Sequence, residues 1–163
     1  MEQIVKADYV QAVMAIKQAI QVSRYRVSRH ANGVSLGLYY GVGKYISERS
    51  RNAAWGTGAI EHISNQLQQE MPGLKGFSAE NMRKMRLFYE AWADVFENRS
   101  AVSNDLGIIP ISADIQPFIF RSTVSNEIAM QDVSCFVSIG FSQHFSIITK
   151  AKNLSARWFY IRK

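Results

Sequence analysis

The chain is poor in the residue types on which most metal and catalytic centres depend. It has one cysteine, Cys135, and three widely separated histidines, His30, His62 and His144. A single thiol excludes an internal disulfide and fits a reducing compartment, and no histidine stands four residues from another, so a zinc site is not expected. We expect Cys135 to be a buried structural thiol. His62 and His144 are expected to be surface or structural residues rather than catalytic ones.

Longer patterns are missing as well. No apolar run approaches the length needed to cross a bilayer, and the first residues lack the basic and then apolar order of a signal peptide. Gly41-Val42-Gly43 is not followed by the third glycine of a dinucleotide-binding loop, and no acid stands two positions before a lysine, as nuclease metal sites commonly require. The sequence therefore predicts a cytoplasmic chain without catalytic residues, cofactor, metal ion or membrane contact.

Positive charge, by contrast, is plentiful and is concentrated in two blocks. The net charge is +6, and a hydrophobic fraction of 47% is enough to form a core. Residues 21–51 carry a net +5, and residues 141–163 carry another +5 without a single acid, whereas the middle of the chain is acidic overall. Such asymmetry favours a polyanionic partner, although a solvated basic surface without a partner would have the same composition.

Apolar spacing predicts two helices in the first third of the chain. A stripe at gaps of 4, 3 and 4 indicates a helix over residues 8–28. The stripe consists of Tyr9, Val13, Ile16 and Ile20. Asn32-Gly33 predicts a turn, and a second helix is expected over 34–50. Its inward residues would be Leu36, Tyr39, Val42 and Ile46. Three glycines in it each cost roughly 1 kcal/mol relative to alanine, so we expect close packing against the first helix to compensate.

The clearest pattern is a pair of helices over residues 58–97. The first is expected over 58–71, ended by Pro72-Gly73, and the second over 79–97, with Ser78 as its N-cap. The apolar stripe of the second helix consists of Met82, Met85, Tyr89, Trp92 and Phe96. Two helices joined by a glycine-bearing turn match the general plan of a helix-turn-helix, although this connector is longer than in the simplest version.

The outward face of the second helix in this pair carries the candidate nucleic-acid site. Burial of the apolar stripe leaves polar and cationic side chains on the opposite face and on its flanks. Arginine can bind guanine through two hydrogen bonds, asparagine can bind adenine, and both reach phosphates. The candidate residues are Lys75, Ser78, Asn81, Arg83, Lys84 and Arg86. An ordinary solvated helix face would carry the same charges.

The segment after this helix pair differs in amino-acid composition from the helical regions before it. Short runs rich in β-branched and aromatic residues stand at 108–111, 115–120 and 135–139, and they predict a small sheet, a wing or an ordered insertion. Helical signals then return: Ser142 is the expected cap of a short helix to Lys150, and Asn153 of a last one. In that last helix, Leu154, Trp158 and Ile161 share one face.

We therefore expect one mainly α domain over residues 1–163. It would be a helical bundle with a helix-turn-helix-like pair and a small β or irregular segment around 105–139. Its parts would be a helical core over 8–98, an insertion or wing over 99–140, and C-terminal helices over 141–163.

Several of these motifs together resemble the N-terminal domain of the YhcG family. They are Gly43–Glu48, Trp55–Glu61, Leu67–Pro72, Lys75–Tyr89 and, in the tail, Ser142, His144, Leu154, Arg157 and Tyr160-Ile161. The resemblance covers most of the chain. It is most specific around Trp55-Gly56 and from Gly76 to Tyr89.

This resemblance implies a bacterial, cytoplasmic protein. Family members typically join the helical domain to a C-terminal nuclease domain of the PD-(D/E)XK type in the same polypeptide, and that domain is not expected in these 163 residues. The N-terminal part is generally regarded as a DNA-binding or interaction module. The leading hypothesis is thus a DNA-binding module without catalytic activity of its own, with RNA left open as the target. The alternative is a protein–protein interaction or dimerisation module that forms a homodimer.

Overall fold

The computed structural model describes residues 2–51, 55, 58–96, 120 and 130–163, with side chains placed from residue 13 onward and, in the last range, from residue 132. In these ranges the chain forms six helices and no strand. They are α1 (Glu2–Arg51), α2 (Ala59–Glu70), α3 (Ala79–Phe96), α4 (Met130–Phe136), α5 (Phe141–Lys150) and α6 (Leu154–Arg162). The predicted mainly α fold is confirmed, and the expected bounds of α2 and α3 agree with the observed ones to within a residue or two.

The first third of the chain is one helix of 50 residues, and the predicted turn at Asn32-Gly33 is wrong. The side-chain amide of Asn32 donates hydrogen bonds to the carbonyl oxygens of Val137 and Ile139, at 2.7 and 2.8 Å. Gly33 lies beside Val137, where even an added Cβ would make only an ordinary contact. The pair is therefore the place where the segment after α4 docks on α1, and the helix continues through it.

Gly43 lets α1 pass directly over α3. A Cβ at this position would overlap the carbonyl oxygen of Met85, so only glycine fits. The sequence predicts close packing of this segment against the first expected helix; at Gly43 the packing is close, but the partner is α3. Backbone contact at the crossing offsets the cost of glycine within a helix.

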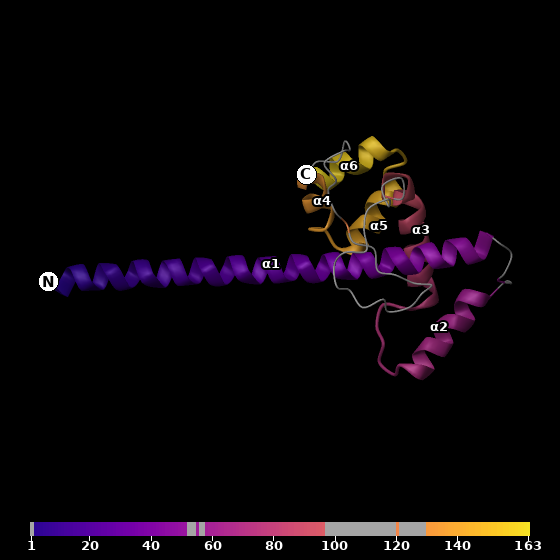
Figure 1. Cartoon of the computed structure of the whole chain (residues 1–163), viewed down its shortest axis with the longest axis horizontal. Coiled ribbons are helices and arrows are strands. Elements are labelled where there is room, and N and C mark those ends of the chain that lie inside the picture. Colours follow the sequence, from indigo (N-terminus) through magenta and orange to yellow (C-terminus); the bar gives the residue numbers. More distant parts are fainter. Residues whose placement is uncertain (1, 52–54, 56–57, 97–119, 121–129) are drawn as a thin grey trace, which may run out of the picture.

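Two apolar clusters hold the fold together on either side of this crossing. The larger joins α1, α3, α4 and α6 through Leu36, Tyr40, Phe88, Trp92, Val95, Phe96, Val133, Phe136, Trp158 and Ile161. The smaller joins α1 and α3, with α2 packed against it, through Val42, Ile46, Met82 and Met85. In Figure 1, α2 accordingly lies on one side of α1, and α4, α5 and α6 lie on the other.

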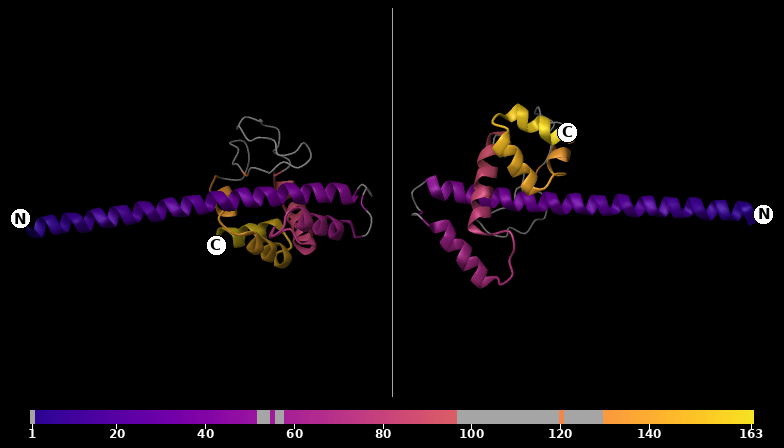
Figure 2. Two further views of the ribbon diagram at one scale, coloured as in Figure 1. Left: turned by 90° about the horizontal axis from the view of Figure 1, so that it is seen from below. Right: turned by 180° about the vertical axis from the view of Figure 1, so that it is seen from behind.

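The N-terminal half of α1 projects far beyond the other helices (Figure 1), and both views of Figure 2 show the same projection. At 1.5 Å per residue, the whole helix is about 75 Å long. Every side chain from residue 13 to residue 28 is exposed. We call these residues the α1 arm. Val13, Ile16 and Ile20 share one face, as the spacing predicts, but that face is not covered by the described part of the chain.

The C-terminal region differs from its prediction at two points. The run 135–139, expected in a small sheet, a wing or an ordered insertion, is the end of α4 and the turn after it. Gly140, not Ser142, precedes α5, and the side chain of Gln143 accepts a hydrogen bond from its N–H at 2.6 Å. Asn153 caps α6 as predicted, because its side-chain oxygen accepts from the Ala156 N–H at 2.8 Å. The runs 108–111 and 115–119, and most of the predicted wing, lie outside the described residues.

Candidate nucleic-acid interface

The connector between α2 and α3 is held by its own polar groups. The Ser78 hydroxyl accepts a weak hydrogen bond from the Asn81 N–H at 3.3 Å, which agrees with its predicted role as N-cap. The Ser64 hydroxyl of α2 donates to the Phe77 carbonyl at 3.0 Å. Lys75 is exposed on this connector, and Asn81 is half-buried at the start of α3. The helix-turn-helix function of this pair stays a prediction.

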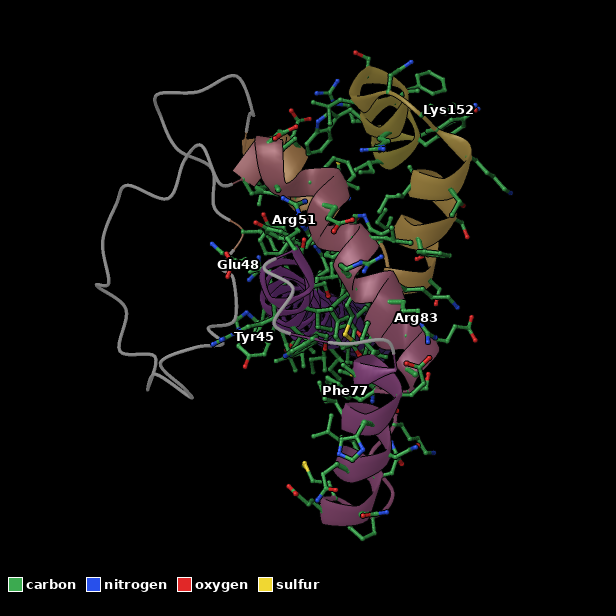
Figure 3. All side chains as sticks on the ribbon, turned by 90° about the vertical axis from the view of Figure 1, so that its right-hand side faces the viewer. Tyr45, Glu48, Arg51, Phe77, Arg83 and Lys152 are labelled. Atoms are coloured by element: carbon green, nitrogen blue, oxygen red, sulfur yellow. The ribbon has the colours of Figure 1, made fainter. Side chains whose placement is uncertain are left out.

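Each predicted cation of α3 has a carboxylate neighbour. Arg83 pairs with Glu61 of α2, and Figure 3 shows Arg83 on the outer side of α3. The Lys84 ammonium lies 2.5 Å from Glu80, and it lowers the pKa of that carboxyl chiefly through their hydrogen bond. Arg86 Nε lies 3.8 Å from Glu90.

The ion pairs leave the face of α3 nearly balanced in charge. Exposed ion pairs contribute only about 0–1 kcal/mol each, so a phosphate can displace a carboxylate at little cost. The gain for a polyanion is nevertheless smaller here than at cations without carboxylate partners, because an acid remains close to each base. The spacing of the cations along α3 was readable from the sequence, whereas Glu61 is brought to Arg83 only by the packing of α2 against α3.

Two long segments of the chain contain no acid at all, and the structure brings them together. These acid-free segments are residues 9–47 and 133–163. The Arg29 guanidinium donates to the hydroxyl and carbonyl oxygens of Ser134, at 2.6 and 2.7 Å, and Asn32 bonds the carbonyls just after α4. Segments more than a hundred residues apart thus meet along the middle of α1, where α4 and α5 lie against it in Figures 1 and 2.

Several cations of the acid-free segments are exposed and have no carboxylate partner among the described residues. They are Lys17, Arg24 and Arg26 on the α1 arm and Lys150 and Lys152 at the end of α5 and just after it. Figure 3 shows Lys152 at the outside of the connection between α5 and α6. None of these residues was singled out as a site candidate from the sequence, although all except Lys17 lie in the two basic blocks, 21–51 and 141–163, which were expected to contact phosphates. The run lengths without acid were visible in the sequence, but their meeting in space was not.

Two further arginines of these segments, Arg29 and Arg157, donate hydrogen bonds that hold the fold together, and their positive charge is not neutralised by these bonds. Arg157 donates to the carbonyls of Ala151 and Ala91, at 3.0 and 2.8 Å, and so ties α6 to α3. Arg29 bonds only the neutral oxygens of Ser134 among the described residues. Their bonds to neutral carbonyls satisfy donors without cancelling charge, so both arginines add to the positive field of this region.

His144 is a structural residue, as predicted. It is fully buried, and its ring lies 4.2 Å from that of Phe136 and 5.2 Å from that of Phe88, between centroids. Nε2 lies 2.9 Å from the Phe136 carbonyl oxygen, which fixes Nε2 as the donor. Burial lowers the pKa of His144 to about 4, against a smaller opposite effect of this hydrogen bond. Cys135 is half-buried, less than expected for a core thiol.

Other kinds of site find no support in the described ranges. They hold no group of three or more histidine, cysteine or acidic side chains placed to bind a metal ion. Among the described residues, none of the helices is apolar over a stretch long enough to span a bilayer.

The comparisons with known proteins place the chain in one family. No curated protein and no solved structure matches it. The family model of the DUF1016 N-terminal domain matches residues 15–163, that is, nearly the whole chain, and this confirms the predicted family resemblance. The chain belongs to the DUF1016 N-terminal domain family.

Proposed function

We propose that this domain binds nucleic acid, DNA in the first place, and carries out no reaction by itself. The supporting observation is the meeting of the two acid-free segments, 9–47 and 133–163, along the middle of α1. Their exposed cations would contact phosphates, which supply most of the affinity in nucleic-acid binding that does not depend on sequence.

The shape of the region suits an extended polyanion. Lys17 and Arg24 lie on the same side of one straight helix, about 10 Å apart along its axis at 1.5 Å per residue, and Arg26 lies about 160° around the helix from Arg24. A DNA duplex offers a phosphate charge about every 1.7 Å of its axis, so a projecting helix can meet several phosphates without bending the duplex. Lys150 and Lys152, at the end of α5 and just after it, are further exposed cations of the acid-free segments.

The residues on α3 have a secondary place in this proposal. Arg83, Lys84 and Arg86 would exchange their carboxylates for phosphates once the domain is bound, and Asn81 would remain the candidate for contact with a base edge. On the family resemblance, the domain would hold a nuclease domain of the same polypeptide on its DNA in the cytoplasm.

Two matched triple variants separate the two surfaces. The arm variant carries Lys17→Gln, Arg24→Gln and Arg26→Gln, and the α3 variant carries Arg83→Gln, Lys84→Gln and Arg86→Gln. Both remove three positive charges. We expect the arm variant to lose more affinity for a fluorescent duplex at low salt, because its cations have no carboxylate partner in the described part of the chain.

Two outcomes of these binding measurements would contradict the proposal. Equal binding of the intact chain to duplex, single strand and a neutral polymer would remove the nucleic-acid proposal altogether. A loss confined to the α3 variant would restore the surface expected from the sequence and refute the arm as the main contact.

A further inference from the structure

The apolar stripe of α1 extends beyond the part of the helix that is covered by the described helices. Val13, Ile16, Ile20, Val27 and Val34 each keep between 47% and 66% of their surface exposed. Five large apolar side chains on one side of a solvated helix form a patch that isolated monomers rarely show.

The stripe has the period of a coiled coil. Val13, Ile20, Val27 and Val34 stand seven residues apart, and Ile16 stands three after the first of them. In a heptad written a to g, the first four occupy a positions and Ile16 a d position. An apolar repeat of seven holds two helices in contact over many turns, whereas a helix packed on a globular body follows 3.6 residues per turn.

The stripe points away from the body of the protein. At about 100° per residue, Arg29 and Asn32 lie about 140–160° around the helix from Val27. Those two residues make the contacts with the segment at and after α4. A second helix can therefore cover the stripe without displacing the contacts of Arg29 and Asn32, and Gly33, which lies beside Val137, is about 100° around the helix from Val34.

We propose that residues 13–34 of α1 pair with the same segment of a second copy in a parallel, two-stranded coiled coil. The four a positions hold valine or isoleucine, as in parallel two-stranded coiled coils, whereas the d positions, where such coils have leucine, hold Ile16, Ser23 and His30. The paired length is about 33 Å.

The charges beside the stripe select the parallel orientation. In a parallel pair in register, a g residue faces the e residue five positions later in the partner. Ala19 then faces Arg24, and Arg26 faces Ala31, so no two cations meet. In an antiparallel pair that keeps the stripe covered, e faces e, and Lys17 of one copy would lie beside Arg24 of the other. Repulsion between these cations disfavours that arrangement.

The polar d positions fix the register and limit the affinity. Ser23 and His30 occupy the two d positions after Ile16. Each would face its own counterpart only in the in-register parallel pair, and polar core residues set register at a cost in stability. A reversible dimer is therefore expected, not a permanent one.

Sedimentation equilibrium of the intact chain, from the low micromolar to the hundred-micromolar range, tests the pairing. Ile20→Asn puts an amide at an a position, and Gln21→Asn makes a matched change one residue later, off the stripe. We expect the first to raise the dimer dissociation constant at least about tenfold and the second to leave it unchanged. The arm makes no contact with the described body, so neither change threatens the fold. A strict monomer, or a dimer indifferent to Ile20→Asn, overturns the proposal.

Cross-linking tests the orientation. In a Cys135→Ser background, Val13→Cys places the two thiols together only in the parallel, in-register pair, because an antiparallel partner would bring His30 to that position instead. Rapid formation of a disulfide-linked dimer is expected. A dimer that is lost in Ile20→Asn but never cross-links at this position would refute the parallel arrangement. The proposed nucleic-acid binding stands or falls separately, since all of these measurements are made without nucleic acid.

Discussion

The imidazole of His144 has room for one hydrogen-bond donor only. Nε2–H donates to the Phe136 carbonyl, whereas Nδ1 is buried without a partner in the described part of the chain. Protonation would place a second N–H and a charge among aromatic rings, where neither is satisfied. The sequence indicated a structural role for His144, but not this environment, because the rings around it belong to other helices: Phe88 and Trp92 to α3 and Phe136 to α4.

Stability should fall on acidification because of this side chain. Its pKa is lowered from the ordinary 6.5 to about 4. As the pH falls below 6.5, the unfolded chain therefore binds a proton that the folded chain refuses, so the contribution is constant above 6.5 and is lost between 6.5 and 4. At about 1.4 kcal/mol per pKa unit, the loss is about 3 kcal/mol.

Urea unfolding at several pH values measures this effect. We expect His144→Gln, whose amide can still donate to the Phe136 carbonyl, to show a shallower decline in the free energy of unfolding between pH 6.5 and 4 than the unchanged chain. His62→Gln is the control, because His62 is exposed. Identical pH profiles for all three proteins would contradict the buried neutral imidazole.

Some of the observed helices could be predicted from local sequence signals, and others could not. For α2 and α3, local signals suffice: apolar spacing, Pro72-Gly73 and the Ser78 cap lie within or beside the helices that they delimit. The Asn32-Gly33 pair misled because its partners, the carbonyls of Val137 and Ile139, are more than a hundred residues away. Local composition does not reveal a hydrogen bond over that separation.

The crossing of α1 and α3 should depend on Gly43. An alanine there gains helix propensity but drives its Cβ into the Met85 carbonyl, and overpacking of this kind costs about 1–3 kcal/mol. Gly33→Ala is the matched control, since its Cβ would meet Val137 at an ordinary 3.6 Å. It should stabilise the chain by up to about 1 kcal/mol. Chemical unfolding compares the two, and equal effects of the same sign would contradict the close crossing.

At the scale of the whole molecule, the cations of α3 have carboxylate partners, whereas several cations of α1 and α5 have none in the described part of the chain. The sequence revealed two basic blocks and a cationic face on α3. The fold pairs each cation of that face with a carboxylate and brings the two acid-free segments side by side. The Arg83–Glu61 pair and the meeting of the acid-free segments depend on tertiary packing, whereas Lys84–Glu80 and Arg86–Glu90 are pairs four residues apart on α3 itself. Several exposed cations that have no carboxylate partner among the described residues are accordingly on α1, at the end of α5 and just after it.

The salt dependence of DNA affinity is the most direct measure of that surface. For a duplex, the slope of log K against log salt concentration falls by about 0.9 for each phosphate contact removed. Replacing Lys17, Arg24 and Arg26 with glutamine should therefore flatten the slope by about 0.9 for each of them that contacts a phosphate: about 1.8 if only Lys17 and Arg24, which share one side of the helix, do so, and at most about 2.7 per bound chain. The same change at Arg83, Lys84 and Arg86 should flatten it less. An arm variant that keeps the full slope of the unchanged chain would contradict phosphate binding by the α1 arm.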